Sequence, residues 1–381
     1  MRILVTGGAG FIGSHTVDAL VERGHQVRVL DSLEPPVHNG EWPNYLPAEV
    51  ELIRGSVSDR DALRRALDGV DAIFHFAAHQ DYHTDFSRFF LTNSVGTALI
   101  YELIVNERLP VQRVVVASSQ AVYGEGRYLC PVDGVRYPDQ RPPAQLEQGD
   151  WEVRCPDCAA PMEPLWTDEA VTAAHNSYGI SKRDQDDIAL KLGLRYGIPS
   201  VALRYSIVQG SRQSFRNAYS GALRSFAVRV LSGQPPVIYE DGEQQRDYVS
   251  IHDVVEANLL VLHDSRADYQ VFNVGGDRRV TVRELAQLVI ETAGVAVEPE
   301  LPGLYRIGDT RHIFSDISKL RALGWEPQVT QSEMVREYLA WATEQPDIHD
   351  TFTEAQMNME AVGVLRKAGG RVLKSPLSRP V

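Results

Sequence analysis

Cysteine is scarce in this sequence, with three residues among 381. A small, odd number of thiols in a long chain is not the pattern of a disulfide-stabilised secreted domain. The sequence also lacks the uninterrupted run of about eighteen apolar residues that predicts a membrane-spanning helix, and its N-terminus has no pattern of a cleaved leader. We therefore expect a cytoplasmic protein that does not enter a membrane.

Lysine and arginine are also fewer than aspartate and glutamate. Against 51 aspartates and glutamates stand 38 lysines and arginines, which leaves a formal net charge of -13. This balance argues against nucleic acid and anionic membranes as partners, although a small basic pocket for a diphosphate is compatible with it. The hydrophobic share of 43% is enough for a large core. Because single cores stop growing at about 250–300 residues, we expect two lobes.

Strand-like and helix-like segments alternate over the first 205 residues. The apolar patterns predict strands at residues 2–6, 27–30, 50–53, 72–77, 113–118 and 200–205, and helices at 14–23, 59–67, 93–107 and 177–196. This alternation is typical of an α/β protein with a doubly wound parallel sheet. We expect a first domain over residues 1–205, a smaller α/β lobe mainly over 206–345, and a C-terminal tail over 346–381.

A glycine series follows the first expected strand. Gly7, Gly10 and Gly13 allow a tight turn, a close approach of backbone N–H groups to a pyrophosphate, and close packing of the next helix. A tight turn without a ligand is the alternative interpretation. However, Asp31 ends the second expected strand, where a carboxylate accepts hydrogen bonds from ribose hydroxyls and repels a 2′-phosphate. The pattern therefore predicts a Rossmann domain that binds NAD rather than NADP.

A tyrosine and a lysine are placed one helical turn apart. Tyr178 and Lys182 share a face of the expected helix over 177–196. The ammonium can stabilise a phenolate whose ordinary pKa, about 10, otherwise makes it a poor base. Ser118 and Ser119 end a strand at the edge of the sheet where such folds carry their chemistry, and either could supply a partner hydroxyl. A solvated helix pair is the alternative.

Several further motifs occur in the same order along the chain. They are residues 6–15 (TGGAGFIGSH), 75–78 (HFAA), Asn93, 96–97 (GT), 118–124 (SSQAVYG), 241–248 (DGEQQRDY), 316–319 (DISK) and 323–325 (LGW). With them, the chain resembles the extended short-chain dehydrogenase/reductase family, in particular its NAD-dependent nucleotide-sugar epimerases and dehydratases. The insertion described below is similar to that of the dTDP-L-rhamnose 4-epimerase-like and UDP-glucose 4-epimerase-like branch.

The resemblance assigns roles to individual residues. It implies Ser119, Tyr178 and Lys182 as catalytic residues, and a homodimer formed through the helices at 93–107 and 177–196. The cofactor residues that it implies, together with those from the glycine pattern, are Gly7, Gly10, Phe11, Ile12, Gly13, Asp31, Ser56, Val57, Ala77, Ala78, Asn93, Tyr178 and Lys182. The expected substrate residues are His79, Ser119, Gln120, Arg246 and Arg311, of which His79 could equally belong to an ordinary loop.

The residues beside Ser119 discriminate between reactions of the family. Gln120 and Ala121 stand where related dehydratases carry an acid/base pair, and neither side chain can transfer a proton. The expected reaction is therefore epimerisation of a nucleotide-diphosphate sugar at carbon 4, with NAD retained. Ile207 stands in place of the asparagine that is usual in the family, so the sequence does not predict which sugar is bound or how it is oriented. A 4-ketoreductase or dehydrogenase with exchanging cofactor, and an NAD-binding regulatory protein without turnover, are the alternatives.

The three cysteines lie in an insertion over about residues 126–172, where prolines cluster and the alternation stops, so that no sheet element is expected there. Cys155 and Cys158 have the spacing of a zinc knuckle, and Cys130 with Asp133 repeats it with an aspartate in the second position. We expect these four residues to bind a structural zinc ion, with His175 as another candidate for the fourth ligand. A loop with ordinary thiols is the alternative.

Overall fold

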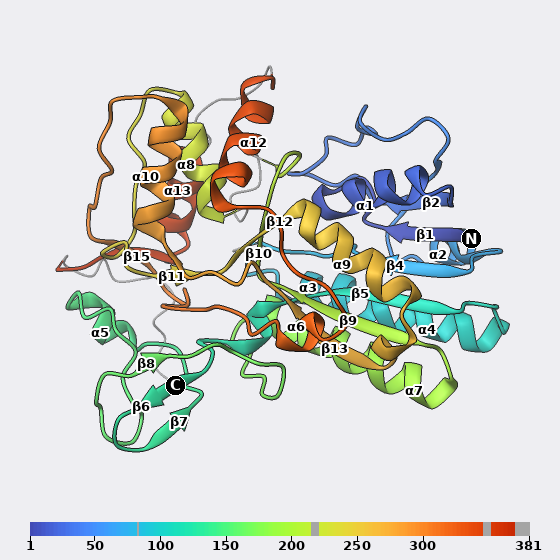
Figure 1. Ribbon diagram of the computed structural model, residues 1–381, viewed down its shortest axis with the longest axis horizontal. Coiled ribbons are helices and arrows are strands. Elements are labelled where there is room, and N and C mark those ends of the chain that lie inside the picture. Colours follow the sequence, from blue (N-terminus) through green and yellow to red (C-terminus); the bar gives the residue numbers. More distant parts are fainter. Residues whose placement is uncertain (82–83, 215–220, 346–351, 370–381) are drawn as a thin grey trace.

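A parallel sheet of seven strands forms the larger lobe (Figure 1). The computed structural model describes residues 1–81, 84–214, 221–345 and 352–369. The strands lie in the order β3, β2, β1, β4, β5, β9, β13, and every neighbouring pair is parallel. Their bounds are Arg2–Thr6 (β1), Gln26–Asp31 (β2), Glu51–Arg54 (β3), Ala72–His75 (β4), Arg113–Ser119 (β5), Ser200–Tyr205 (β9) and Gln270–Val274 (β13). This confirms the expected doubly wound α/β fold.

Helices cover both faces of this sheet. One face packs against α1 (Phe11–Glu22) and α9 (Ile251–His263), and the other against α2 (Arg60–Leu67) and α4 (Gly96–Glu107). Helix α6 (Ser177–Asp187) continues through η3 (Ile188–Leu192) into α7 (Gly193–Tyr196), as the single expected helix over 177–196. The strands are rich in Val, Ile and Leu because they are buried from both sides.

The helical stretch that ends in α4, expected at residues 93–107, is longer than the sequence pattern predicts. Helix α3 (Phe86–Phe89) and η1 (Phe90–Val95) lead directly into α4. Within the described part of the chain, this stretch alone is long and apolar enough to cross a membrane by length and composition. Half of its apolar window is buried, and Ile100, Tyr101 and Ile104 pack into the core under the sheet. This packing accounts for the apolar composition.

The smaller lobe is built mainly from α8 (Gly221–Leu231), α10 (Val282–Ala293) and α12 (Gln331–Thr343), which share a separate core. Its paired strands are β10 (Ile207–Gln209) with β12 (Tyr248–Ser250), and β11 (Gln245–Arg246) with β14 (Val280–Thr281). The lobe boundary differs from the expected one at residue 205, because α9 and β13 return to the large sheet. Short helices occur at Ser265–Ala267 (η4) and Ser318–Arg321 (α11).

The insertion has a sheet of its own, contrary to expectation. Strand β6 (Tyr128–Cys130) pairs antiparallel with β7 (Gly134–Arg136) and β8 (Glu163–Pro164), and α5 (Pro143–Glu147) lies beside them. These strands are too short to show the period-two pattern by which strands are predicted. In Figure 1 the insertion lies below the smaller lobe, at the end of the molecule away from α4 and α7.

The C-terminal segment is folded onto the smaller lobe rather than set apart as a tail. Helix α13 (Phe352–Ala361) packs against α8, with the Arg229 guanidinium 5.0 Å from the centre of the Phe352 ring. Strand β16 (Leu365–Lys367) pairs antiparallel with β15 (Leu304–Arg306). The expected boundary at residue 346 therefore does not separate a tail from the lobe. The last part of the expected tail, which contains the basic residues Arg371, Lys374 and Arg379, lies outside the described residues.

Candidate active site

A cavity of about 1240 Å³ lies at the carboxyl ends of the central strands, where the smaller lobe faces the sheet. Sites for drug-sized ligands span about 300–1,000 Å³. This cavity is therefore large enough for a dinucleotide and a second ligand. Its position outside the carboxyl ends of the strands is the one in which open α/β sheets bind ligands.

The glycine turn forms one wall of the cavity. The N–H of Gly10 donates to the carbonyl of Gly7 (3.1 Å), and Gly10 caps α1 without any side-chain hydrogen bond. A Cβ on Gly13 would stand 2.1 Å from the Gly7 oxygen, so only glycine permits this approach. The first turn of α1 therefore presents backbone N–H groups and its dipole to the cavity, as an anion-binding helix terminus does.

Asp31 lies at the end of β2, on the rim of the same wall. Its carboxylate accepts hydrogen bonds from the amides of Ala9 (3.0 Å) and Leu33 (2.9 Å), which fix its orientation. The cavity also collects most of the other residues expected from the sequence. These are Gly7, Gly10, Phe11, Ile12, Gly13, Ser56, Val57, Ala77, Ala78, His79, Ser119, Gln120, Tyr178, Lys182 and Arg246.

Tyr178 and Ser119 meet at the bottom of the cavity. Ser119 ends β5 and accepts a hydrogen bond from the amide of Ala121 (3.1 Å), while its hydroxyl contacts the phenol of Tyr178 on α6. Ser118 also lines the cavity and is almost fully buried. Burial raises the pKa of Tyr178 to about 12, against which the hydrogen bond from Ser119 acts. A phenolate at neutral pH therefore needs additional positive charge nearby.

Lys182 is the nearest cation. Its Nζ lies 5.9 Å from the centre of the Tyr178 ring and donates to the carbonyl of Ala117 (2.6 Å) and to Gln185 Oε1 (2.8 Å). Burial lowers the pKa of Lys182 to about 7, while Asp186 favours the charged form. Behind the lysine, burial and the Lys182 charge lower the pKa of His75 to about 3, which leaves that imidazole neutral.

Asn93, expected to bind the cofactor, does not line the cavity. It is fully buried, and its Oδ1 accepts the amide of His79 (2.8 Å) while its Nδ2 donates to the His79 carbonyl (3.1 Å) and to Ser181 Oγ (2.9 Å). Asn93 therefore joins the loop after β4 to helix α6. In this structure the hydrogen bonds of the side chain go to His79 and Ser181.

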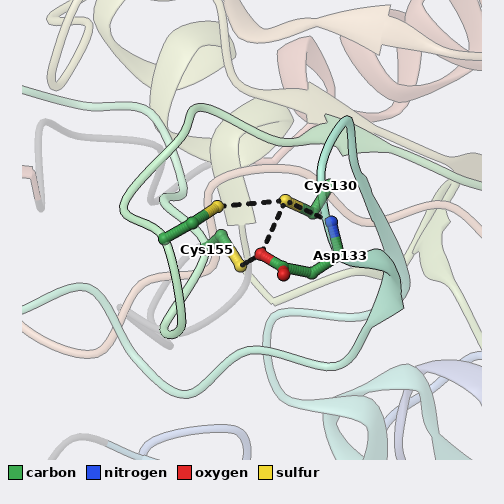
Figure 2. Close-up of side chains that lie close together, drawn as sticks. Cys130, Asp133 and Cys155 are labelled. Atoms are coloured by element: carbon green, nitrogen blue, oxygen red, sulfur yellow. Dashed lines mark hydrogen bonds between the residues drawn. The ribbon is translucent and has the colours of Figure 1, made fainter.

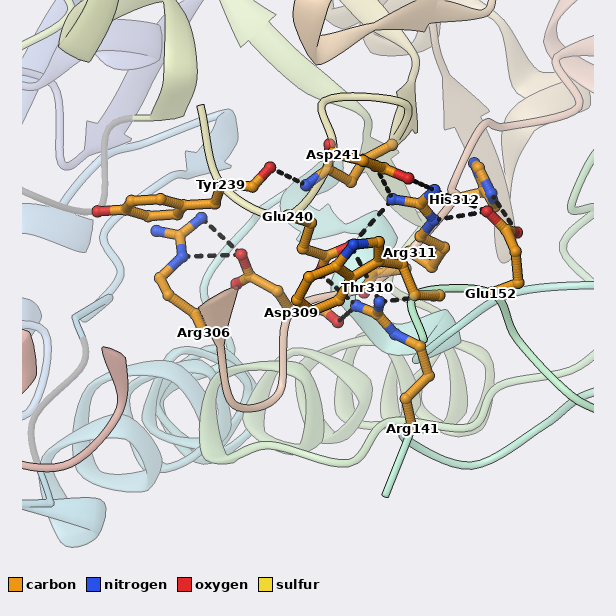
Figure 3. A network of polar contacts seen from close by, with 12 residues as sticks. Arg141, Glu152, Tyr239, Glu240, Asp241, Arg306, Asp309, Thr310, Arg311 and His312 are labelled. Carbon is orange, nitrogen blue, oxygen red and sulfur yellow. Dashed lines mark hydrogen bonds and ion pairs between the residues drawn. The ribbon is translucent and has the colours of Figure 1, made fainter. Parts of the chain in front are cut away.

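Arg311, expected to bind the substrate, is also outside the cavity. Its fully buried guanidinium bonds to Glu152 (2.6 Å), Glu240 (2.9 Å) and Asp241 (2.7 Å), as Figure 3 shows. Glu152 and the adjacent residues Glu240 and Asp241 are all distant in sequence from Arg311, so no local pattern predicts the pairing. Its donors are occupied by these protein carboxylates, so in this structure Arg311 is not placed to contact a ligand in the cavity.

Two other arginines face the cavity from the smaller lobe. Arg246 donates to the carbonyls of Gln245 (3.0 Å), Thr310 (2.7 Å) and Arg311 (2.8 Å), which holds the 306–313 loop against β11. Arg306, which the sequence analysis missed, pairs with Asp309 (2.7 Å). Carbonyl groups do not cancel a full charge, so Arg246 keeps a positive charge at this end of the cavity.

The C-terminal segment contributes a part of the wall that no sequence signal indicated. Asn358, Met359 and Val362 line the cavity beside Arg306. Tyr82 and His83 lie outside the described residues, whereas His79 is in the cavity and pairs with Asp81 (2.8 Å). The four expected metal ligands lie together in the insertion, outside the cavity, and His175 is not among them but lines the cavity.

Comparisons with known proteins agree with this geometry. A family model described as the NAD dependent epimerase/dehydratase family matches residues 3–145 and 156–275. The dTDP-L-rhamnose 4-epimerase of Burkholderia thailandensis is 33% identical over 91% of this chain and 96% of its own length. The dTDP-glucose 4,6-dehydratase of Streptomyces niveus is 30% identical over 90% and 92%. The UDP-glucose 4-epimerase of Thermus thermophilus, solved with NAD, is 30% identical with a TM-score of 0.69, over 90% of this chain and 98% of that one.

Proposed function

Because the chain belongs to the NAD dependent epimerase/dehydratase family, we propose that it interconverts the carbon-4 epimers of a nucleotide-diphosphate sugar with NAD retained in the site. The observation that carries this proposal is the convergence of Ser119, Tyr178 and Lys182 on one cavity, with Gln120 and Ala121 as their immediate neighbours. The resemblance seen in the sequence motifs is confirmed at the level of the family. The substrate and the carbon that reacts are our inference.

The glycine turn fits the diphosphate of NAD. The wall that Gly7 and Gly13 form has no room for a Cβ, and α1 directs uncapped backbone N–H groups toward it. Asp31 would bind the adenosine ribose, and Ser56 and Val57 would lie near the adenine. When bound, NAD would accept a hydride from the sugar and return it. The protein residues then have to orient the sugar and move one proton.

Tyr178 is the proposed base. Its phenolate takes the proton of the reacting sugar hydroxyl and becomes the phenol, and Ser119 hydrogen-bonds the same sugar oxygen. In the buried site the tyrosine pKa of about 12 is too high for this task. Lys182, together with the positive charge of an oxidised nicotinamide, stabilises the phenolate and lowers that pKa. The lysine bonds to Ala117 and Gln185 hold the ammonium in the position where this effect operates.

Gln120 and Ala121 favour epimerisation over dehydration. Elimination of water requires an acid and a base at carbons 5 and 6 of the sugar, in addition to the tyrosine. The two positions next to Ser119 line the cavity and offer an amide and a methyl group. Because neither of these two side chains can donate a proton, a 4-keto sugar in this site would be reduced again rather than dehydrated. It turns in the site and takes the hydride back on its other face.

The charges in the cavity suggest how the substrate lies. Arg246 and Arg306 form a basic end at the smaller lobe, suited to the diphosphate. The His79 and Asp81 pair, in the loop after β4, also lines the cavity and can bond sugar hydroxyls. Ile207 adds an apolar side chain to the lining. We therefore place the sugar between Tyr178 and His79, with the nucleotide toward Arg246.

We also propose a homodimer formed through the long helices. Leu91, Val95 and Leu194 are apolar side chains with 49%, 44% and 64% exposure on η1 and α7. The stretch of η1 and α4 lies beside α6 and η3, and α4 and α7 lie at the end of the large lobe away from the smaller lobe (Figure 1). A Leu194→Glu variant should be monomeric by light scattering. A wild-type chain that is already monomeric would refute this arrangement.

One assay tests the function. The purified protein is incubated with a panel of nucleotide sugars, the epimers are resolved by NMR, and the absorbance of free NADH is followed at the same time. We expect two carbon-4 epimers to interconvert without net NADH. Net NADH formation would instead identify a redox enzyme, and a 4-keto-6-deoxy product a dehydratase. Binding of every sugar without turnover would identify a regulatory protein.

A catalytic variant and its control complete the test. Tyr178→Phe should reduce turnover by about 10²–10⁴-fold while the folded protein keeps NAD. Tyr196→Phe removes a phenol from the exposed end of the same continuous helix, at α7, and should be fully active. Equal activity of Tyr178→Phe and the wild type would overturn the mechanism.

A further inference from the structure

Three cysteines and one aspartate converge in the insertion (Figure 2). Cys130 and Asp133 lie at the turn between β6 and β7, and Cys155 and Cys158 lie in the loop before β8. The four ligand atoms are all within 4.8 Å of one another. No disulfide joins them, because the three thiols are free. Two segments well separated in sequence have therefore been brought to one point by the fold of the insertion.

The spacing of these atoms matches the edges of a coordination tetrahedron. With Zn–S bonds of about 2.3 Å and Zn–O bonds of about 2.0–2.2 Å, tetrahedral ligands stand about 3.5–3.8 Å apart. Cys130 Sγ lies 3.4 Å from Cys158 Sγ and 3.4 Å from Asp133 Oδ2, and Cys155 Sγ lies 3.2 Å from the same oxygen. A slight expansion of this group admits one ion at its centre.

The backbone around Cys130 favours a thiolate. The amides of Val132 (3.4 Å) and Asp133 (3.3 Å) both donate to its sulfur. Such N–H···S bonds stabilise the negative charge of a metal-bound thiolate and orient it. In the second loop, the amide of Cys155 donates to the carbonyl of Ala160 (2.8 Å), and the amide of Ala159 donates to the carbonyl of Cys155 (2.9 Å). This tight turn brings Cys158 back toward Cys155.

The insertion has only a small apolar core of its own. Its own core consists of Tyr128, Cys130, Val153, Cys155 and Met162, with Ala160 at its edge. A core of this size is too small to stabilise a segment of some 40 residues, and small modules of this kind usually depend on a metal or a disulfide. Two of the core residues are themselves members of the cysteine group.

From these observations we propose that Cys130, Asp133, Cys155 and Cys158 bind one structural zinc ion. All four positions of a tetrahedral site are filled by protein, which is the mark of a structural rather than a catalytic zinc site. None of the four residues lines the cavity, so the ion takes no part in the reaction.

The insertion that carries the cysteine group is joined to the smaller lobe by the polar network in Figure 3. Glu152, three residues before Cys155, bonds to the Arg311 guanidinium, and Arg141 bonds to Glu240 at 2.9 and 3.0 Å. The carbonyl of Arg311 is in turn held by Arg246 in the cavity wall. Glu152 also lies in residues 146–155, which the family model leaves unmatched. The cysteine group therefore lies next in sequence to a residue through which the insertion bonds to the smaller lobe.

Metal content tests the proposal directly. The full chain, purified without chelator from zinc-containing medium, should hold about one zinc per chain by elemental analysis. Asp133→Ala and Cys155→Ser should each hold less than about a fifth of that amount. Asp157→Asn is the matched control, because Asp157 lies inside the knuckle, pairs with Arg136 and is not a ligand. It should retain all of the zinc.

A spectroscopic readout separates loss of the site from failure to fold. Cobalt(II) exchanged into the wild-type protein should show the intense visible absorption of a tetrahedral thiolate site, and Asp157→Asn should show the same spectrum. On removal of the metal, hydrogen exchange should speed up in residues 128–164 while β1, β4 and β5 keep their protection.

Three results would overturn the proposal. They are a metal-free protein with three titratable thiols, a bond between Cys130 and Cys158 in place of the metal, and unchanged hydrogen exchange in the insertion after complete metal removal. None of these readouts depends on enzymatic activity. A failure of the epimerase proposal would therefore leave the zinc result intact, and the reverse also holds.

Discussion

Gly179 packs directly against the backbone of Ala121. A Cβ on Gly179 would stand 2.5 Å from the Ala121 carbonyl oxygen, closer than atoms of this kind approach one another. The missing side chain lets α6 lie against the turn that follows Ser119. The contact therefore sets how closely Tyr178, the preceding residue on α6, approaches the serine hydroxyl.

Gly179→Ala is expected to separate the catalytic pair. The added methyl group meets backbone on the β5 side and must push α6 away, and a displacement of about 1 Å at a reacting group can cost about 10²-fold in rate. We expect kcat to fall by about that factor while the NAD content, measured after denaturation, stays near the wild-type value. A variant with wild-type kcat would show that α6 can absorb the methyl group without moving Tyr178.

Lys182→Met is expected to shift the pH dependence of turnover. A cation beside Tyr178 favours the phenolate and so lowers its pKa, and removal of the charge raises it. The acid limb of kcat at saturating NAD should therefore move to higher pH, by at least about one unit. The profile is measured with the preferred substrate from the NMR panel. An unmoved acid limb with lower kcat would assign Lys182 a purely structural role.

Asp31→Asn is expected to relax the preference for NAD. The amides of Ala9 and Leu33 donate to different oxygens of Asp31, so the variant keeps one of these two acceptors and loses the charge that repels a 2′-phosphate. We expect the NAD affinity to fall about 10- to 150-fold, in line with the loss of a charged hydrogen bond worth about 1.5–3 kcal/mol, and NADP binding to become measurable. Calorimetric titration of cofactor-free protein gives both affinities. Continued exclusion of NADP would show that other groups enforce the selectivity.

Arg311→Leu is expected to cost stability rather than substrate affinity. Glu240 is buried with 2% exposure, and loss of one partner of a buried ion pair destabilises a protein by about 3–5 kcal/mol. Arg283→Ala breaks the exposed pair with Glu243, and should change the free energy of unfolding by less than about 1 kcal/mol. Denaturant unfolding compares the two variants. If Arg311→Leu were as stable as Arg283→Ala, then Arg141 alone would suffice to neutralise Glu240.

The parts of the site that depend on local pattern were predictable. The glycine turn, Asp31 at the end of β2 and the Tyr178 and Lys182 spacing each follow from the geometry of one strand or one helix. The same is true of six of the seven sheet strands, whose ends differ from the expected ones by at most two residues. Fold and family follow from these elements, because parallel strands bring their carboxyl ends to one edge.

The remaining parts depend on contacts between distant segments. Arg311 and Arg306 lie close together in the sequence, and only the three-dimensional placement of Glu152, Glu240 and Asp241 decides which of them is buried. Strand β13 joins the large sheet by pairing with β9, although α8 and α9 separate these two strands in the sequence. No periodicity within either segment carries that information.

The pairing of β15 with β16 can form only late in the synthesis of the chain. The strands, turns and helices that hold NAD have all left the ribosome long before residues 352–369 are made, and domains fold as their sequence emerges. The wall formed by Asn358, Met359 and Val362 closes only afterwards. A chain still in synthesis can thus complete its large sheet while the cavity beside Arg306 still has an open side.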